Sequence, residues 1–283
     1  MSKTDIILVA DCGSTKTDWT LSSREYGIQE VHTLGINPVR DSQDAIFRVV
    51  AEELVPQLPA DCQPAEIFFY GAGCMQPYSQ TVHNVLQQIF PQASIQVESD
   101  LLGAARALCG CRPGIACILG TGANSCLYDG QSITAHVPPL GFILGDEGSG
   151  AVLGRNFLNG ILKGWLPATL RDEFFAESGQ TYDDIIQRVY RQPLANRYLA
   201  TIVPFIHQRI DEPSLRQLVA DNFEAFFRYN VLRYATPLRR MACVGGMAAP
   251  FQTILSEVAS RHDFELVRVM RSPIEGLMTF HRP

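Results

Sequence analysis

The feature that most constrains the fold is an order of apolar runs and turns that occurs twice along the chain. In the first half, strand-like runs cover residues 5–13, 16–23 and 27–35, and the turns between them are short enough for an antiparallel meander. Segments with helical and strand periodicity then alternate up to residue 110, which completes the order βββαβαβα. The same order starts again at residue 114. The repeat predicts two α/β domains of one duplicated topology, which we expect to face each other around a cleft.

The charge and composition exclude several classes of partner. The chain of 283 residues has a net charge of −6, so neither a nucleic-acid backbone nor an anionic membrane surface would be attracted to it. No run of about 18 apolar residues occurs, and no apolar segment of signal-peptide length precedes the first strand. We expect a cytoplasmic protein with no nucleic-acid and no membrane partner, in which any phosphate site is built locally from backbone amides, cations and a metal.

The cysteines do not follow a metal-binding pattern. There are eight, mostly inside apolar runs, and none belongs to a CxxC pair or to a Cys/His set with zinc spacing. We interpret them as reduced, mostly buried thiols, and a metal or iron–sulfur role for Cys109 and Cys111 is the alternative.

The stretch VADCGSTKTDWTL, at 9–21, places small and hydroxylated residues around one lysine on a turn between two strands. Gly13 permits a positive φ and a close approach of the backbone, so the amides of Ser14 to Lys16 are able to point at phosphate oxygens. Ser14 and Thr15 add hydroxyl donors, and Lys16 adds a charge. An ordinary β-hairpin turn is the competing interpretation, because such turns use the same residue types.

Two further features favour the phosphate interpretation. Asp11 ends the first buried strand and is well placed to hold Mg²⁺ through water, the usual way in which a carboxylate binds that ion. The stretch LGTGAN, at 119–124, occupies the equivalent place in the second copy.

Three segments together resemble a known superfamily. The stretches ILVADCGSTKTDWTL, ILGTGANSCLY and ACVGGMAAPF look like the first phosphate, second phosphate and adenosine segments of the acetate and sugar kinase/heat-shock-protein/actin superfamily. Within it, GFILGDEGSGAVLG and GINPVR are similar to the N-acetylglucosamine kinase-like branch of the BadF/BadG/BcrA/BcrD ATPase family. The resemblance covers nearly the whole chain. It implies two ribonuclease H-like (actin-like ATPase) domains and an ATP-dependent kinase of an amino sugar.

The resemblance also implies how the chain is divided, because the last helix of such folds crosses back onto the first domain. We therefore expect a first domain that binds phosphate and sugar, made of residues 1–108 together with 270–283. The second domain, residues 109–269, would bind the nucleotide and carry a helical insert at about 149–237.

Carried over by position, the resemblance assigns ATP to the glycine-containing turns. Thr15 and Thr121 would touch the phosphates, and Asp11 would govern Mg²⁺. The segment CVGGMA would leave room for adenosine against the backbone at a helix start, although a plain strand-to-helix turn is the alternative. The assigned ATP-binding residues are Gly13, Ser14, Thr15, Lys16, Thr121, Gly122, Gly245, Gly246 and Pro250.

The sugar is assigned in the same way to Asn37, Asn124, Leu140, Gly141 and Asp146. An amide and a carboxylate together both donate to and accept from hydroxyl groups, which suits a polyol. Asn37 precedes a proline, so a simple turn is its competing interpretation. Leu140 stands where family members carry a bulky aromatic residue, and the chain departs from the family there.

Two acids have a helix-cap alternative. The resemblance places the catalytic aspartate at Asp100, where it would accept the proton of the attacking sugar hydroxyl, O6. An aspartate just ahead of the helical run 101–110 is also what a helix N-cap requires. Glu147 could likewise cap the helix that follows it.

Three functions agree with the sequence. The first is a kinase forming the 6-phosphate of N-acetylglucosamine, with glucosamine and N-acetylmuramic acid as close alternatives. The second is an ATPase that energises a partner enzyme, as the dehydratase and reductase activators of the family do with an iron–sulfur cluster. The third is a sugar sensor without catalysis. A homodimer agrees with the resemblance, and ATP and Mg²⁺ are the expected cofactors.

Overall fold

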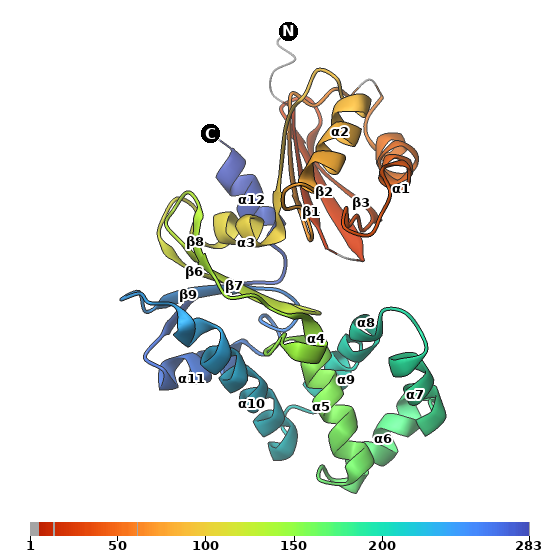
Figure 1. Cartoon of the computed structure of the whole chain (residues 1–283), viewed down its shortest axis with the longest axis vertical. Coiled ribbons are helices and arrows are strands. Elements are labelled where there is room, and N and C mark those ends of the chain that lie inside the picture. The colour runs from red at the N-terminus through yellow and green to blue at the C-terminus, as the bar shows by residue number, and fades with distance from the viewer. Residues whose placement is uncertain (1–5, 14, 61, 283) are drawn as a thin grey trace. The chain divides into compact units, whose positions relative to one another are not determined.

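The computed structural model describes residues 6–13, 15–60 and 62–282, and its chain forms two compact units. Unit 1 contains residues 1–110 and 273–283, and unit 2 contains residues 111–272. Each unit has one mixed five-stranded sheet, with strand orders β3-β2-β1-β4-β5 and β10-β9-β6-β7-β8 (Figure 1). If the strands of unit 2 are numbered from one, β6 to β10 become the first to the fifth strand. Read from the β8 end, their order is then the same as that of unit 1, which confirms the duplicated α/β fold expected from the repeat.

The sheet of unit 1 is covered on both faces because its central strand is apolar on both sides. Leu8 and Ala10 of β1 pack into the core beneath α1 and α2, whereas Val9 packs with Leu277 of α12 on the opposite face. The strands are β1 (Ile7–Cys12), β2 (Lys16–Ser23), β3 (Gly27–Leu34), β4 (Glu66–Gly71) and β5 (Ser94–Ser99). The helices are α1 (Gln43–Arg48), continued by a π-helical turn Val49–Leu54 and a 3-10 turn Val55–Gln57, α2 (Ser79–Ile89), α3 (Asp100–Cys109) and α12 (Ile274–His281).

The end of α12 is attached to the sheet by a polar and aromatic cluster. Arg106 Nη1 donates to the Tyr70 hydroxyl at 2.8 Å, and that hydroxyl donates its proton to His281 Nε2, 2.7 Å away. The His281 ring stacks on Phe68 with its centroid 3.6 Å from that of the phenyl ring. Burial and then the Arg106 charge lower the pKa of His281 to about 4. The imidazole is therefore neutral at pH 7 and accepts a hydrogen bond.

This cluster predicts an acid-sensitive stability. Below about pH 6.5 the unfolded chain binds a proton at His281 that the folded chain does not bind until about pH 4, so the free energy of unfolding should fall as the pH drops. Between pH 7 and pH 5 we expect wild type to lose about 1 kcal/mol more than His281→Phe, measured by urea denaturation. His83→Phe, on α2, is the control and should follow wild type. Parallel pH curves for wild type and His281→Phe would contradict this account.

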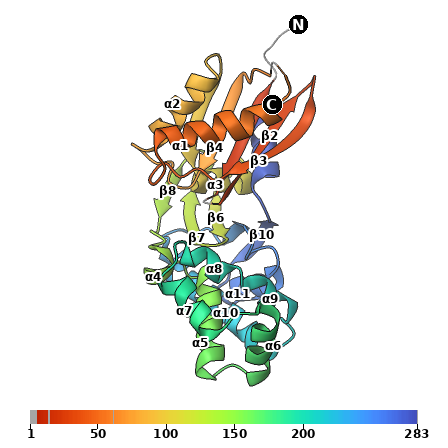
Figure 2. The same cartoon turned by 90° about the vertical axis from the view of Figure 1, so that its right-hand side faces the viewer.

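Unit 2 repeats the sheet and adds a block of helices between β8 and β9, from α5 to α10 (Figure 2). The block has its own aromatic core, in which the rings of Phe157, Phe174 and Phe205 meet with centroids 5.4 Å apart. The strands are β6 (Gly114–Leu119), β7 (Ala123–Tyr128), β8 (Ile133–His136), β9 (Arg240–Val244) and β10 (Glu265–Met270). The helices are α4 (Gly141–Leu144), α5 (Gly150–Lys163), α6 (Ala168–Ser178), α7 (Tyr182–Tyr190), α8 (Ala195–Ala200), α9 (Val203–Gln208), α10 (Pro213–Tyr229) and α11 (Gln252–Arg261).

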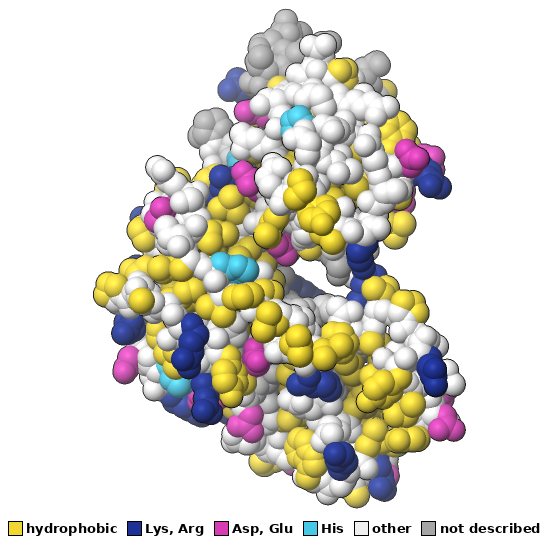
Figure 3. All heavy atoms as spheres, in the orientation of Figure 1, with side chains coloured by type: hydrophobic (Ala, Val, Ile, Leu, Met, Phe, Trp, Pro, Cys, Tyr) yellow, Lys and Arg dark blue, Asp and Glu magenta, His cyan; other side chains and the backbone are white. Residues whose placement is uncertain are grey.

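The surface carries charges of both signs. On the face shown in Figure 3, Lys and Arg side chains of the described residues are scattered and interspersed with Asp and Glu. No helix in the described ranges is both long and apolar enough to cross a membrane. Six of the cysteines are buried, whereas Cys109 is half-buried and Cys111 is exposed.

Candidate functional site

The turn between β1 and β2 is a tight hairpin. The Gly13 amide donates to the Lys16 carbonyl at 3.0 Å, and the Gly35 amide donates to the Thr15 carbonyl at 3.1 Å. Gly13 does not adopt the positive φ that glycine permits, because the hairpin closes without it. Thr15 and Lys16 are exposed, and Ser14 lies outside the described residues. The exposed side chains of this turn are available to a ligand.

Lys16 is held by an acid on its own strand. Its Nζ lies 2.8 Å from one carboxylate oxygen of Asp18, and His32 Nδ1 on β3 lies 2.7 Å from the other. Asp18 and His32 are direct partners in the antiparallel register of β2 and β3. The Asp18 side chain is 15% exposed, whereas that of Lys16 is 65% exposed. The cation is thus anchored at one side and open to solvent at the other.

The surroundings of Asp11 disfavour its charged form. Burial raises the pKa of Asp11 to about 7, and the negative charges of Asp100 and Asp18 add to the effect, while Lys16 opposes it. A carboxyl group in such surroundings gains from a nearby cation. Among the described residues the Asp11 carboxylate accepts no hydrogen bond, so its oxygens remain available. These features fit Mg²⁺ bound through water to one carboxylate, the arrangement typical of a nucleotide-bound Mg²⁺.

Asp100 is the first residue of α3 and not its cap. The N-cap is Ser99, whose hydroxyl accepts a hydrogen bond from the Leu102 amide at 3.2 Å, so the cap interpretation of Asp100 is wrong. The Asp100 Oδ1 accepts from the Leu101 amide at 2.9 Å, and burial raises the pKa of the carboxyl above its ordinary value. No cation among the described residues pairs with Asp100. A half-buried, unpaired carboxylate of raised basicity just after a strand is suited to accept a proton.

Asn37 uses its side-chain oxygen to build the turn that follows β3. Its Oδ1 accepts from the Val39 amide at 3.1 Å, and its own amide donates to Asp41 Oδ2 at 2.7 Å. An added Cβ at Gly73 would lie 2.7 Å from the same Oδ1, so the two loops touch. The side-chain oxygen of Asn37 therefore has the structural role in a turn that the competing interpretation gave this residue. Its Nδ2 has no partner in the described ranges and remains able to donate to a ligand.

In unit 2, three predicted segments meet at the turn after β6. The Met247 amide, after β9, donates to the Leu119 carbonyl at 2.8 Å. The amides of Gly150 and Ala151, at the start of α5, donate to the carbonyls of Gly120 and Thr121 at 2.8 and 3.1 Å. The second phosphate segment, the adenosine segment and the GDEGSG loop thus form one connected structure.

The GDEGSG loop presents Asp146 in a constrained backbone conformation. Asp146 has a φ of 56°, in the left-handed region that a non-glycine residue rarely adopts. Its amide donates to the Pro139 carbonyl at 2.8 Å, and its Oδ1 accepts from the Ala123 amide at 3.2 Å. Burial raises the pKa of its carboxyl. The constraint and the two hydrogen bonds fix the direction of this acid.

Glu147 does not cap α5, because Ser149 does so by accepting from the Val152 amide at 3.1 Å. The cap alternative for Glu147 is therefore wrong, and its Oε2 instead accepts from Asn230 Nδ2 at 3.4 Å.

The segment before this loop exposes apolar side chains. Leu140 and Gly141 both have positive φ, 62° and 73°, and the short helix α4 that follows was not expected from the sequence. Leu140, Ile143 and Leu144 are 61%, 74% and 76% exposed. Leu140 and Gly141 thus lie within one closed loop with Asp146, since the Pro139 carbonyl joins its two ends.

Sequence reasoning missed one face of α10 that supports the loop. Asn222, Phe226 and Asn230 follow one another at intervals of four residues and so lie on the same side of the helix. Asn222 Oδ1 accepts from the Gly148 amide at 3.1 Å, and its Nδ2 donates to the Ser149 carbonyl at 3.1 Å. Phe226 lies so close to Gly148 that an added Cβ there would be 2.9 Å from the Phe226 Cβ.

Replacing Asn222 should destabilise the loop strongly, because this side chain is only 3% exposed and makes both hydrogen bonds. We expect Asn222→Leu to lower the free energy of unfolding by about 2–3 kcal/mol, because the Gly148 amide and the Ser149 carbonyl lose buried partners. Urea denaturation measures the loss, and Gln217→Leu, on the exposed side of the same helix, is the control. Equal stability of the two variants would contradict the role of Asn222.

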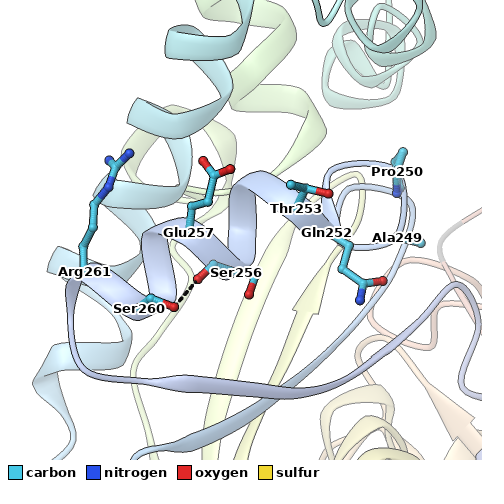
Figure 4. Close-up of a pocket in the computed structure, with 8 residues that line it drawn as sticks. All are labelled: Ala249, Pro250, Gln252, Thr253, Ser256, Glu257, Ser260 and Arg261. Carbon is cyan, nitrogen blue, oxygen red and sulfur yellow. Dashed lines mark hydrogen bonds between the residues drawn. The ribbon is translucent and has the colours of Figure 1, made fainter.

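Beyond Gly245 and Gly246, a pocket of about 900 Å³ runs along one side of α11 (Figure 4). It begins at Ala249 and Pro250, where the adenosine segment ends, and Figure 4 shows the remaining lining residues along the helix. Gly245 has a φ of 129°, and a Cβ there would overlap the Leu119 carbonyl, so this position requires glycine. At Gly246, in contrast, no heavy atom lies within 4 Å of the position of a Cβ. The open space at Gly246 is what a ligand lying against the backbone would need.

Comparison with solved structures finds proteins that match nearly the whole chain. A candidate N-acetylglucosamine kinase from Porphyromonas gingivalis is 44% identical, with 97% of this chain and 98% of that chain covered and a TM-score of 0.93. A second candidate N-acetylglucosamine kinase, from Chromobacterium violaceum, is 19% identical over 99% and 100% of the two chains with a TM-score of 0.75.

A more distant structure shares the fold. It is a ROK family glucokinase from Streptomyces griseus in complex with glucose and AMPPNP, 14% identical over 97% of each chain with a TM-score of 0.57. No family model matches the sequence, and no curated protein does. Near-complete coverage at 44% identity, together with the segments described above, shows that the chain belongs to the N-acetylglucosamine kinase-like branch of the BadF/BadG/BcrA/BcrD ATPase family, within the actin-like ATPase fold.

Proposed function

We propose that this protein is an ATP-dependent kinase that phosphorylates an amino sugar, with N-acetylglucosamine as the substrate and its 6-phosphate as the product. The observation that carries the proposal is the 44% identity, over nearly the full length of both chains, to a candidate N-acetylglucosamine kinase. The local geometry supports it independently. A half-buried acid with no cationic partner, a hairpin turn with an exposed lysine and an acid on a glycine-rich loop suit phosphoryl transfer to a sugar.

In this proposal Asp100 is the general base. Burial raises its pKa, which makes the carboxylate more basic than that of an exposed aspartate and favours removal of the proton from the sugar O6. As that proton moves to the carboxylate, O6 attacks the γ-phosphorus of ATP, and ADP leaves. The hydrogen bond from the Leu101 amide occupies Oδ1 of Asp100, so Oδ2 is the oxygen left to take the proton.

The negative charge of the phosphates would be stabilised by the turn between β1 and β2 and by the turn after β6. Lys16 contributes a positive charge, and Thr15 and Thr121 contribute hydroxyl donors. Mg²⁺, held through water by Asp11, would neutralise charge on the transferring phosphoryl group. The sugar would be read by the Asn37 and Asn124 amides together with the Asp146 carboxylate, and the nucleotide would lie along Gly245, Gly246 and Pro250.

The proposal is tested by coupled ADP release with ATP and Mg²⁺ against N-acetylglucosamine, glucosamine, N-acetylmuramic acid, N-acetylmannosamine and glucose. We expect N-acetylglucosamine to have the highest kcat/KM of the five. Iron is measured on the same preparation, because an activator of dehydratases or reductases would carry an iron–sulfur cluster. ADP release that no sugar increases, in a protein that contains iron, would replace the kinase proposal with that alternative.

A further inference from the structure

The amide of Asn124 is fixed by two hydrogen bonds to one atom. Asn124 lies in β7, and its Oδ1 is 2.9 Å from the backbone nitrogen of Ser125. A backbone N–H only donates, so this atom is the amide oxygen and the orientation of the amide group is defined. His136 on β8 places its Nε2 2.8 Å from the same oxygen. An oxygen acceptor requires a donor opposite it, so His136 carries a proton on Nε2.

The other end of the amide is left open. Within the described ranges, Asn124 Nδ2 has no hydrogen-bond partner, although the two donors fill the acceptor positions of Oδ1. An unrestrained asparagine can present either its oxygen or its nitrogen to a ligand by rotating about the Cβ–Cγ bond. The fixed amide of Asn124 presents only its N–H groups. Asp146 is fixed nearby as an acceptor through its bond to the amide of Ala123, the neighbour of Asn124.

We propose that His136 is a positioning residue that makes Asn124 a dedicated hydrogen-bond donor to a hydroxyl oxygen of the sugar. The inference rests on the proposed sugar-kinase function, which it deepens by assigning the polarity of one substrate contact. Asn124 donates to a sugar oxygen and Asp146 accepts from a sugar hydroxyl, so the two residues together recognise hydroxyl groups both as acceptors and as donors of hydrogen bonds. His136 itself touches no substrate and acts through Asn124.

Partial desolvation lowers the pKa of His136, so the ring is neutral at pH 7.5, and the hydrogen bond to Asn124 Oδ1 places its single proton on Nε2. This predicts a spectroscopic signature that does not depend on catalysis. The ¹⁵N shifts of His136, assigned with the His136→Gln variant, should show a protonated Nε2 and an unprotonated Nδ1 at pH 7.5. A neutral ring with its proton on Nδ1 would overturn the proposal, because such a ring could not donate to Asn124.

Kinetics test the consequence for the substrate. His136→Leu removes the donor and should raise the KM for N-acetylglucosamine about threefold to tenfold, while the KM for ATP and kcat change by less than twofold. His136→Gln keeps an N–H donor and should restore a KM within twofold of wild type. Thr134→Val, on the same strand, is the matched control. An unchanged sugar KM in His136→Leu, or a rise that Gln does not restore, would overturn the proposal.

The same experiment separates failure of this inference from failure of the kinase proposal. If the wild type phosphorylates none of the sugars, the kinase proposal fails, and N-acetylglucosamine is then titrated while the side-chain amide signals of Asn124 are followed. Movement of those signals in wild type, reduced in His136→Leu, would still support a fixed sugar donor. Signals that do not move would overturn the inference as well.

Discussion

Replacing Asp100 with Asn is expected to lower kcat by about 10²- to 10⁴-fold, the usual contribution of a general base. The amide keeps the hydrogen bond from Leu101 only through its oxygen and has no basic oxygen left for the sugar proton. Because the charge of Asp100 also raises the pKa of Asp11, its removal should lower that pKa. ADP release measures kcat, and the KM for ATP should change far less.

The control for this prediction lies two residues earlier, on the strand β5 that precedes α3. Glu98→Gln removes a carboxylate from β5 without touching the α3 terminus, and it should keep kcat within twofold of wild type. Ser99→Ala removes the true N-cap and should lower the free energy of unfolding by about 1 kcal/mol. If Asp100→Asn lost stability as Ser99→Ala does but kept its kcat, Asp100 would be a structural residue and the mechanism would be wrong.

The second large effect is expected at the adjacent glycines after β9. A Cβ at Gly245 would overlap the Leu119 carbonyl, and its φ of 129° is strained for any other residue. Gly245→Ala should therefore separate the β9 turn from β6 and lower the free energy of unfolding by about 2–4 kcal/mol. Thermal and urea denaturation measure the loss.

Gly246→Ala is the matched substitution, because the added methyl group enters open space. We expect its stability to stay within about 0.5 kcal/mol of wild type. If adenosine lies against this backbone, the same methyl group should raise the KM for ATP about tenfold or more, a loss of at least about 1.4 kcal/mol of binding. Unchanged stability with an unchanged KM for ATP would show that nucleotide does not occupy the space at Gly246.

Much of the fold could be predicted because it depends on local patterns. The strand expected at 16–23 is β2 itself, because a short turn on each side marks where it begins and ends. The helical spacing that follows Asp41 and Ser42 is α1, which begins at Gln43 with Ser42 as its N-cap. The helix changes to a π-helical turn at Val49, a change that apolar spacing does not encode.

The parts of the site that could not be predicted depend on contacts far apart in the chain. Ser99 and Asp100 are both good N-cap residues, and only the register of β5 and α3 decides between them. Asn222 supports a loop 74 residues away. Its one signal is a polar residue on the apolar side of α10, four residues before the buried Phe226, and that pattern alone does not name a partner.

The most direct test of the central claim is ³¹P NMR of a reaction containing the full-length protein, ATP, Mg²⁺ and N-acetylglucosamine. The account predicts equal amounts of ADP and a sugar phosphomonoester, with the phosphorus coupled to the two protons on C6 of the sugar. Inorganic phosphate in place of the sugar phosphate, formed at the same rate without sugar, would contradict it and show an ATPase.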